Sequence, residues 1–215
     1  MKRKIALRLT TAFLFTFMGG FCDGYTYLTR GGMFSYMQTG NLIKLCISIA
    51  NGSFEVMFLI PIIVFCLGCI AIVFLSKYKY YTYITTILLL ASFVSCSFCP
   101  NEYVWNIVCV STLSFVGAMQ FQAFNKCLDF HYTSTMCTNN MRLFSTNLAN
   151  KNFVKAMFYL AIILSFALGV IISVFIIKAL DIYALAPGAS IFVIILILLL
   201  INKDDIKADE DEVTD

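Results

Sequence analysis

The chain has 215 residues, of which 60% are hydrophobic and 13% charged, and its formal net charge is +3. Its mean hydropathy of +0.87 and its low charge set it apart from soluble domains, in which about a quarter of the residues are charged. This composition excludes a soluble globular domain and predicts one membrane domain over residues 1–203.

Six apolar segments are long enough to cross a bilayer, which needs about 20 residues. They cover residues 5–28, 55–76, 81–99, 104–125, 155–178 and 184–201. The first follows the basic stretch Lys2-Arg3-Lys4, and no small-residue cleavage site comes after it. We therefore interpret it as a membrane helix with a basic anchor and not as a secretory signal. The fold class expected is all-α, a polytopic membrane helical bundle.

Two further segments, 33–52 and 132–152, follow the first and the fourth of these spans. Both are too rich in Thr, Asn, Gln and Ser for a helix surrounded by lipid. We expect two short polar helices that re-enter the membrane, lie at its interface or line a cavity, because irregular backbone at membrane depth requires protein or water around it. If both segments crossed fully, each half of the chain would have four spans and the two halves would run in parallel.

The distribution of basic residues predicts the topology. With the N-terminus inside and six crossings, twelve of the fifteen lysines and arginines fall on the cytoplasmic side. The three on the outer side are Arg30, Lys44 and Lys178. This bias places both termini in the cytoplasm. Residues 204–215 form an acidic tail that we expect to be solvated and disordered.

One polar pattern occurs twice in the chain. Residues 19–24 and 37–41 correspond to residues 118–123 and 136–140 after a shift of 99 positions. The shift superposes Asp23 on Gln122, Thr39 on Thr138, and Asn41 on Asn140. Because polar residues are costly in lipid, their repetition at matching positions predicts one site built from two halves.

The repeat and the topology together predict the architecture. Each half, about 5–99 and about 104–201, contains three crossings, so the two halves run in opposite directions through the membrane. A 3+3 inverted repeat is common among secondary transporters, whose binding sites lie near the midplane between the repeats.

Polar residues of both copies are the candidate ligands for a small solute or an ion. They are Asp23, Gln38, Thr39, Asn41, Gln120, Gln122, Asn139 and Asn140. Amides inside a span usually hydrogen-bond to a neighbouring helix, so Gln120 and Gln122 could bind a substrate or hold the halves together. The repeat also predicts that Asp23 and Gln122 meet at the pseudo-twofold axis.

Asp23 is the only acidic residue in the interior of a predicted span. A bare carboxylate at that depth costs about 2.5–3.5 kcal/mol even on the mildest scale, so it must be paired, solvated or protonated. One interpretation is a proton- or cation-coupling site. The other places Asp23 nearer the outer surface, in water, where it caps the following segment.

The stretches 39–41 and 138–140 resemble helix starts, because Thr and Asn are good N-terminal caps. A short helix whose N-terminus points into the protein offers free N–H groups and a positive dipole end, which suits an anion. Simple capping at a membrane interface is the alternative.

The nine cysteines include Cys66 and Cys69, and Cys96 and Cys99, both at the spacing of a zinc-binding pair. The only histidine, His131, is distant in sequence, so we interpret Cys66 and Cys69 as packing residues and predict no metal and no cofactor. Cys96 and Cys99 lie near a predicted helix end, where a disulfide between them is left open. Neither a nucleotide-binding loop nor a nucleophile–base pair is present, and we expect no enzyme.

The residues from Gly20 to Asn41 resemble the YoaK family of bacterial membrane proteins. The matching motifs are Gly-Phe-x-Asp-Gly and then Gly-Gly-Met-Phe-x-x-Met-Gln-Thr-Gly-Asn. In the second half Gln122 replaces the family's asparagine, and Asn139 its glycine. The resemblance implies a bacterial inner-membrane protein with about six spans, and no established substrate.

These observations lead to a small secondary transporter, acting on a small solute or an ion, with proton coupling as one option. The alternative is a non-transporting membrane scaffold or assembly protein. The expected partners are the lipid bilayer and the solute; no nucleic acid is expected, and a homo-oligomer is left open.

Overall fold

The computed structural model describes residues 2–201, with side chains from residue 5 onward, and it is mainly helical. In chain order the elements are α1 Lys2–Thr29, α2 Gln38–Ala50, α3 Val56–Leu75, α4 Tyr81–Ser97, α5 Tyr103–Ala123, β1 Lys126–Cys127, β2 Phe130–His131, α6 Thr138–Ala149, α7 Phe153–Leu180 and α8 Leu185–Ile201. The predicted acidic tail, residues 204–215, lies outside the described residues.

A helix occupies each of the six predicted spans. Within residues 2–201, four stretches are long and apolar enough to cross a membrane. They are Ile5–Thr29, Val56–Leu75, Tyr103–Ala123 and Phe153–Ile201. The last contains both α7 and α8, joined by a short 3-10 turn, and α4 is a shorter apolar helix. The all-α membrane fold is therefore confirmed, while the small hairpin of β1 and β2 was not predicted.

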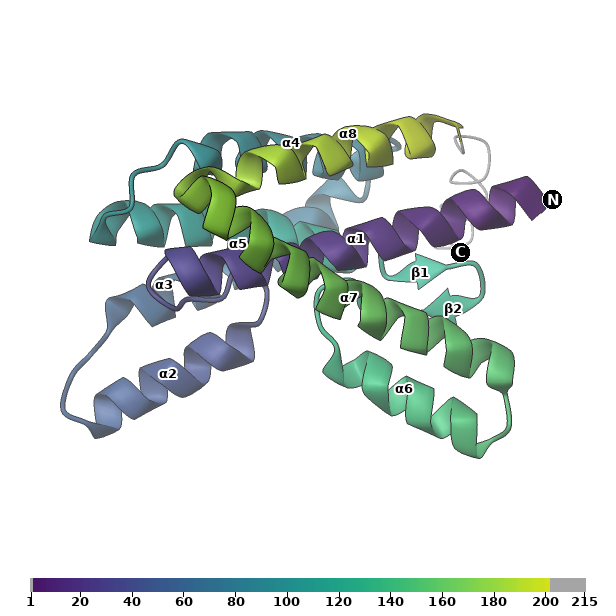
Figure 1. Ribbon diagram of the computed structural model, residues 1–215, viewed down its shortest axis with the longest axis horizontal. Helices are drawn as coiled ribbons and strands as arrows, with labels where there is room; N and C mark the ends of the chain where they lie inside the picture. The colour runs from purple at the N-terminus through teal and green to yellow at the C-terminus, as the bar shows by residue number, and fades with distance from the viewer. Residues whose placement is uncertain (1, 202–215) are drawn as a thin grey trace.

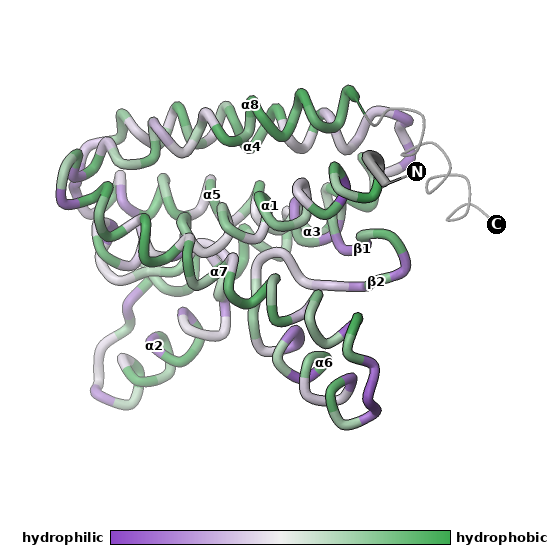
Figure 2. Tube along the Cα trace, turned by 45° about the vertical axis from the view of Figure 1, so that its right-hand side comes forward, coloured by the Kyte–Doolittle hydropathy of each residue, from purple (hydrophilic) through white to green (hydrophobic). Residues whose placement is uncertain are grey.

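The helices form layers (Figure 1). α4 lies beside α8 on one side of the molecule, and α1, α3, α5 and α7 form the layer next to it. Within that layer α1 packs along α7, and α3 packs along α5. The short helices α2 and α6 lie on the opposite side, against α3 and α7. Figure 2 shows the long helices as mainly hydrophobic, with hydrophilic positions gathered at helix ends and loops.

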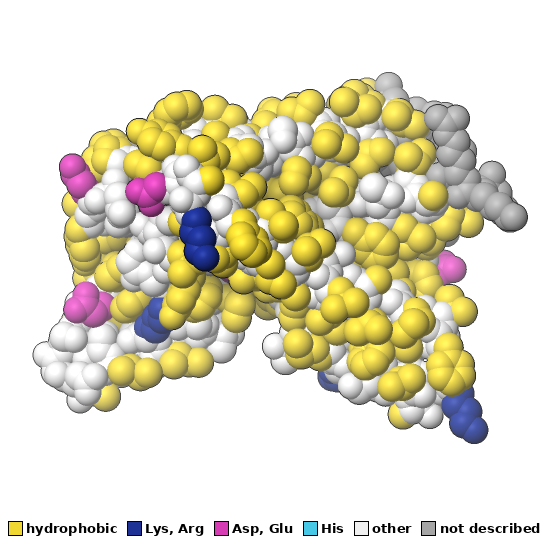
Figure 3. Space-filling view, viewed as in Figure 1, with side chains coloured by type: hydrophobic (Ala, Val, Ile, Leu, Met, Phe, Trp, Pro, Cys, Tyr) yellow, Lys and Arg dark blue, Asp and Glu magenta, His cyan; other side chains and the backbone are white. Residues whose placement is uncertain are grey.

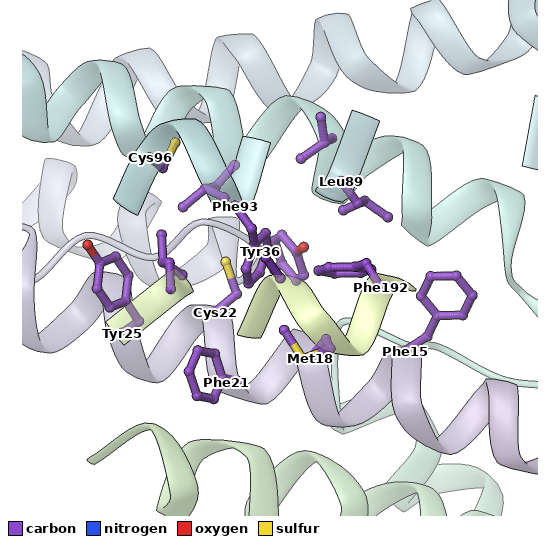
Figure 4. Close-up of a cluster of buried hydrophobic side chains, with 14 of the residues drawn as sticks. Phe15, Met18, Phe21, Cys22, Tyr25, Tyr36, Leu89, Phe93, Cys96 and Phe192 are labelled. Atoms are coloured by element: carbon purple, nitrogen blue, oxygen red, sulfur yellow. The ribbon is translucent and has the colours of Figure 1, made fainter. Parts of the chain in front are cut away.

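The largest buried cluster lies between α1, α4 and α8 (Figure 4). Phe15, Met18, Phe93 and Phe192 are its central side chains, all fully buried. The rings of Phe93 and Phe192 meet edge to face with centroids 4.8 Å apart. This cluster joins α1 to α8.

Glycines bring α1 and α7 into close contact. A Cβ atom on Gly20 would collide with the backbone oxygen of Phe166, and one on Gly169 would collide with the backbone oxygen of Phe17. Small residues at such crossings let helix backbones approach closely, as is common in membranes. Gly20 and Gly169 therefore allow α1 and α7 to pack closely.

The outer surface of the bundle suits a lipid environment. On the face shown in Figure 3, hydrophobic side chains predominate and few charged ones interrupt them. Exposed large apolar residues include Leu67, Ile70 and Phe74 of α3 and Leu164 and Phe175 of α7. A soluble protein rarely exposes apolar surface on this scale, so these faces are the ones that contact lipid.

Candidate functional site

The two short polar helices are anchored in the same way. In the first half, the Asn41 side chain accepts a bond from the backbone N–H of Phe34 (2.9 Å) and donates one to the Phe34 carbonyl (2.6 Å). In the second half, Asn140 makes the same two bonds with Thr133, at 3.1 and 2.7 Å. Asn41 and Asn140 therefore hold the loop before each helix and do not act as N-terminal caps, because the helices begin at Gln38 and Thr138.

Asp23 is buried, with 3% of its surface exposed. Its Oδ1 atom accepts hydrogen bonds from the Tyr36 backbone N–H (2.8 Å) and from the Ser35 hydroxyl (3.2 Å). Its Oδ2 atom is buried and has no partner within the described part of the chain. Asp23 thus stabilises the loop that leads into α2, and its burial differs from the interpretation that places it nearer the outer surface, in water.

Gln38 extends this network at the start of α2. Its amide nitrogen donates to the Ser35 carbonyl (2.6 Å) and to the hydroxyl of Ser114 on α5 (3.3 Å). Its amide oxygen accepts from Asn41 at 2.9 Å. The first polar segment is therefore tied to a helix of the second half.

Gln120 is fully buried where the two halves meet. Its amide nitrogen donates to the Phe15 carbonyl of α1 (3.1 Å) and to the Ser134 hydroxyl (3.4 Å). Its amide oxygen accepts from the Tyr36 hydroxyl at 3.3 Å. The Gln120 amide thus links α1 with both polar loops. Burial also raises the pKa of the Tyr36 phenol well above its ordinary value.

Three predicted site residues lie elsewhere. Thr39 and Asn139 are exposed, and the Asn139 amide accepts a bond from Arg142 at 3.0 Å. Gln122 lies at the other end of the bundle, beside Cys69. The described contacts do not pair Asp23 with Gln122; the residue that reaches the loop around Asp23 from α5 is Gln120. The side chain of α5 that points toward the centre thus differs from the one the repeat predicted.

The start of α6 also lies close to Asp23. Cys137 precedes α6, and burial raises the pKa of its thiol to about 11, with a smaller contribution in the same direction from the negative charge of Asp23. Both polar segments therefore converge on the Asp23 side of α1.

Arg30 is a residue that the sequence did not mark as part of a site. It is fully buried, although its position just after the first span suggested contact with water. Its guanidinium donates to the Tyr25 hydroxyl (2.6 Å), to Asn106 (3.1 Å) and to the carbonyls of Cys96, Cys99 and Pro100 at 2.9–3.3 Å. Arg30 therefore joins the end of α1 to the end of α4 and the start of α5. Only the rarity of basic residues on the predicted outer side could have marked it in the sequence.

A cavity of about 580 Å³ lies at the opposite end of the bundle, beside the hairpin. Polar lining residues include Arg8, Gln122, Asn125, Lys126 and His131. Aromatic ones are Phe15, Tyr81, Phe124 and Tyr132, and the rings of Phe15 and Phe124 stack with centroids 3.9 Å apart. The volume falls in the range of small-molecule sites, which is about 300–1,000 Å³.

Among residues 5–201, the structure brings together no group of three His, Cys, Asp or Glu side chains that could hold a metal ion. All nine cysteines fall within this range and are free thiols. Cys96 donates weakly to the Cys109 carbonyl, at 3.7 Å, and is not bonded to Cys99.

The comparisons with known proteins identify a family. Residues 11–198 match a family described as a protein of unknown function, DUF1275. The chain belongs to the DUF1275 family. This assignment agrees with the resemblance to YoaK-type proteins that the motifs around Asp23 and Asn41 indicated. No curated protein and no solved structure matched the chain. For this DUF1275 protein, the functional argument therefore depends on its own geometry.

Proposed function

We propose that this DUF1275 protein is a secondary transporter of the bacterial inner membrane, built as an inverted repeat with both termini in the cytoplasm. The observation that carries the proposal is the meeting of the two polar loops at Gln120, between the halves, beside the buried carboxyl of Asp23. A solute or ion passing between the halves would pass this point.

The packing pattern supports two related halves. In the repeat, α1, α2, α3 and α4 correspond to α5, α6, α7 and α8. The pair α1–α7 then corresponds to the pair α5–α3, and the pair α4–α8 corresponds to itself. These three pairs are the ones that pack most extensively. The loops follow the same rule. A Cβ on Gly19 would meet the backbone of Ser134, and one on Gly117 would meet the ring of Tyr36, so each loop crosses to the first helix of the other half.

The halves differ in one respect that alternating access requires. Phe124 and Leu199 line the cavity, and the shift of 99 residues superposes them on Tyr25 and Pro100. Arg30 hydrogen-bonds to Tyr25 and to Pro100, so its side chain fills the region of the first half that corresponds to the cavity. One end of the pathway is thus hollow while the related place at the other end is filled. In transporters of this architecture, interconversion of the two half-conformations exposes the site to each side in turn.

Thiol accessibility tests this proposal without knowledge of the substrate. Cys22 is buried next to Asp23 and shares a hydrogen bond with Ser35 (3.2 Å). In a variant that keeps Cys22 alone, a membrane-impermeant thiosulfonate should react from either side of sealed vesicles. A variant that keeps only Cys66, which is exposed on α3 in the lipid-facing zone, is the control and should react from neither side. A Cys22 thiol that never reacts would contradict alternating access.

Proton coupling is tested in liposomes that contain a pH-sensitive dye. Solutes that drive proton entry through the wild-type protein should drive none through Asp23→Asn, since Asp23 is the buried carboxyl at the junction. Equal proton flux in both proteins would remove Asp23 from the coupling mechanism.

A non-transporting scaffold is the second candidate, and one observation favours it. The amides of Asn41, Asn140 and Gln120 are all bonded within the protein, as expected of groups that only hold two halves together. A scaffold needs no opening, so complete protection of Cys22 from both sides would support this function.

A further inference from the structure

We propose that the cavity beside the hairpin binds a small organic anion, with its charged group at the basic rim and its apolar body among the aromatic rings. As the entrance that selects the transported solute, this site rests on the proposed transport function. As a binding site it is tested separately, by equilibrium binding.

The charge of the cavity lining indicates the sign of the ligand. Arg8 of α1, Lys126 of β1 and His131 of β2 line it, and none of its described lining residues is acidic. Asp129 lies in the hairpin turn between these strands but does not line the cavity. The apolar walls of the cavity focus the field of these side chains on a ligand inside it.

The basic rim is more than a consequence of membrane orientation. Lys77 and Lys79 follow α3 at the same end of the bundle, and they lie over the rings of Phe74 and Tyr80 outside the cavity. The orientation of the chain in the membrane explains why basic residues lie near this end of the bundle, but not why some of them line the same cavity. Arg8, Lys126 and His131 in addition line one hollow, and two amides, Gln122 and Asn125, line it with them.

The deeper wall determines the rest of the ligand. Phe15, Phe124 and Tyr132 are buried and line the cavity, so they offer apolar faces rather than further charge. Ligand sites typically combine such apolar walls with a few polar groups that fix orientation. A carboxylate or phosphate on a compact apolar body matches this combination.

Three probes of one shape test the inference. Benzoate, neutral benzamide and cationic benzamidinium would be titrated by calorimetry into the purified full-length protein in phosphatidylcholine nanodiscs. We expect measurable binding of benzoate, and at least tenfold weaker binding of the other two. Equal binding of benzamide and benzoate would overturn the inference, because the cavity would then select shape and not charge.

Substitutions test whether the basic residues at the rim of the cavity account for the binding of benzoate. Lys126→Gln should weaken benzoate binding by about tenfold, as loss of one charge-assisted contact does. Arg8→Gln should do the same, and Arg8→Lys should restore part of the affinity. Lys77→Gln and Lys79→Gln are matched controls that should leave binding unchanged. Equal weakening in both pairs would overturn the assignment, because general surface charge would then account for binding. Because Lys126 is exposed, its variant is informative even if Arg8→Gln does not fold.

A lipid headgroup carries the same chemistry as a free anion, so nanodiscs containing phosphatidylglycerol form a separate arm. If benzoate does not bind in phosphatidylcholine nanodiscs while phosphatidylglycerol does occupy the cavity, the inference of a soluble anionic ligand is wrong. If benzoate fails to bind while Cys22 still reacts from both sides, the inference is wrong and the transport proposal is unaffected.

Discussion

Asn41 and Asn140 make the same pair of hydrogen bonds in the two halves of the chain, each to the backbone seven residues before it. Each side chain satisfies one N–H and one carbonyl in a loop that has no regular secondary structure. Such groups cost free energy when they are buried without partners. The repeated asparagine therefore explains how two irregular loops are tolerated inside an apolar bundle.

Asn41→Ala and Asn140→Ala should each destabilise the protein by about 2 kcal/mol, because each leaves one N–H and one carbonyl without a partner, partly buried at Phe34 and buried at Thr133. Thermal or denaturant unfolding in detergent, followed by circular dichroism, measures the effect. Asn150→Ala is the control, since Asn150 is exposed at the end of α6. An Asn140→Ala protein as stable as this control would show that the bonds contribute nothing.

Gly20→Ala and Gly169→Ala should also destabilise the protein, by a different mechanism. Alanine favours a helix over glycine by about 1 kcal/mol, which alone would stabilise α1 or α7. The added methyl group, however, collides with the backbone of Phe166 or Phe17, which cannot move like the end of a side chain. Overpacking costs about 1–3 kcal/mol, so we expect a net loss of stability.

The same unfolding measurement serves for this pair, with Ala91→Val on the exposed face of α4 as its control. A glycine variant more stable than the wild type would contradict the close packing of the α1 and α7 backbones.

The sequence predicted the helices well, because long apolar segments leave the chain few alternatives in lipid. Five of the residues proposed as ligands are buried or partly buried in the structure, namely Asp23, Gln38, Asn41, Gln120 and Asn140. Their binding of a solute or ion stays a prediction. It could not tell which face of α5 points inward. Gln120 and Gln122 are about 200° apart around a helix that turns about 100° per residue, so only one of them can reach the centre.

The partners of each polar group were also beyond the sequence. Tyr36 and Ser35 hold Asp23 and Gln120, but both belong to an irregular loop whose path depends on tertiary packing. The sequence places Arg30 at the outer surface because it directly follows the first predicted span, whose N-terminal end the basic residues place in the cytoplasm. Carbonyls at the end of α4 provide acceptors that no local pattern reveals.

Arg30→Gln should destabilise the protein by about 3 kcal/mol, because several buried acceptors lose a charged donor. The proposed alternating access adds a second expectation: weakening this end of the bundle favours its opening. Cys109 is buried there, and its alkylation by an impermeant reagent added outside sealed vesicles should become faster. Lys178→Gln is the control, since Lys178 lies in the last turn of α7, exposed over the ring of Phe175. A lower stability without faster alkylation would limit Arg30 to a structural role.

Cys137 provides a prediction that depends on pH. Burial raises the pKa of its thiol to about 11, and only the thiolate reacts with iodoacetamide. In a variant that keeps this cysteine alone, the alkylation rate should rise about tenfold for each pH unit from pH 7 to pH 10, because the pKa lies above this whole window.

Asp23→Asn removes a negative charge that disfavours the Cys137 thiolate, so it should lower the pKa of the thiol and speed the alkylation at each pH in this window. Mass spectrometry of the alkylated peptide gives both rates. A rate that levels off near pH 9 would contradict the burial of Cys137, and an unchanged rate in Asp23→Asn would contradict its electrostatic contact with Asp23.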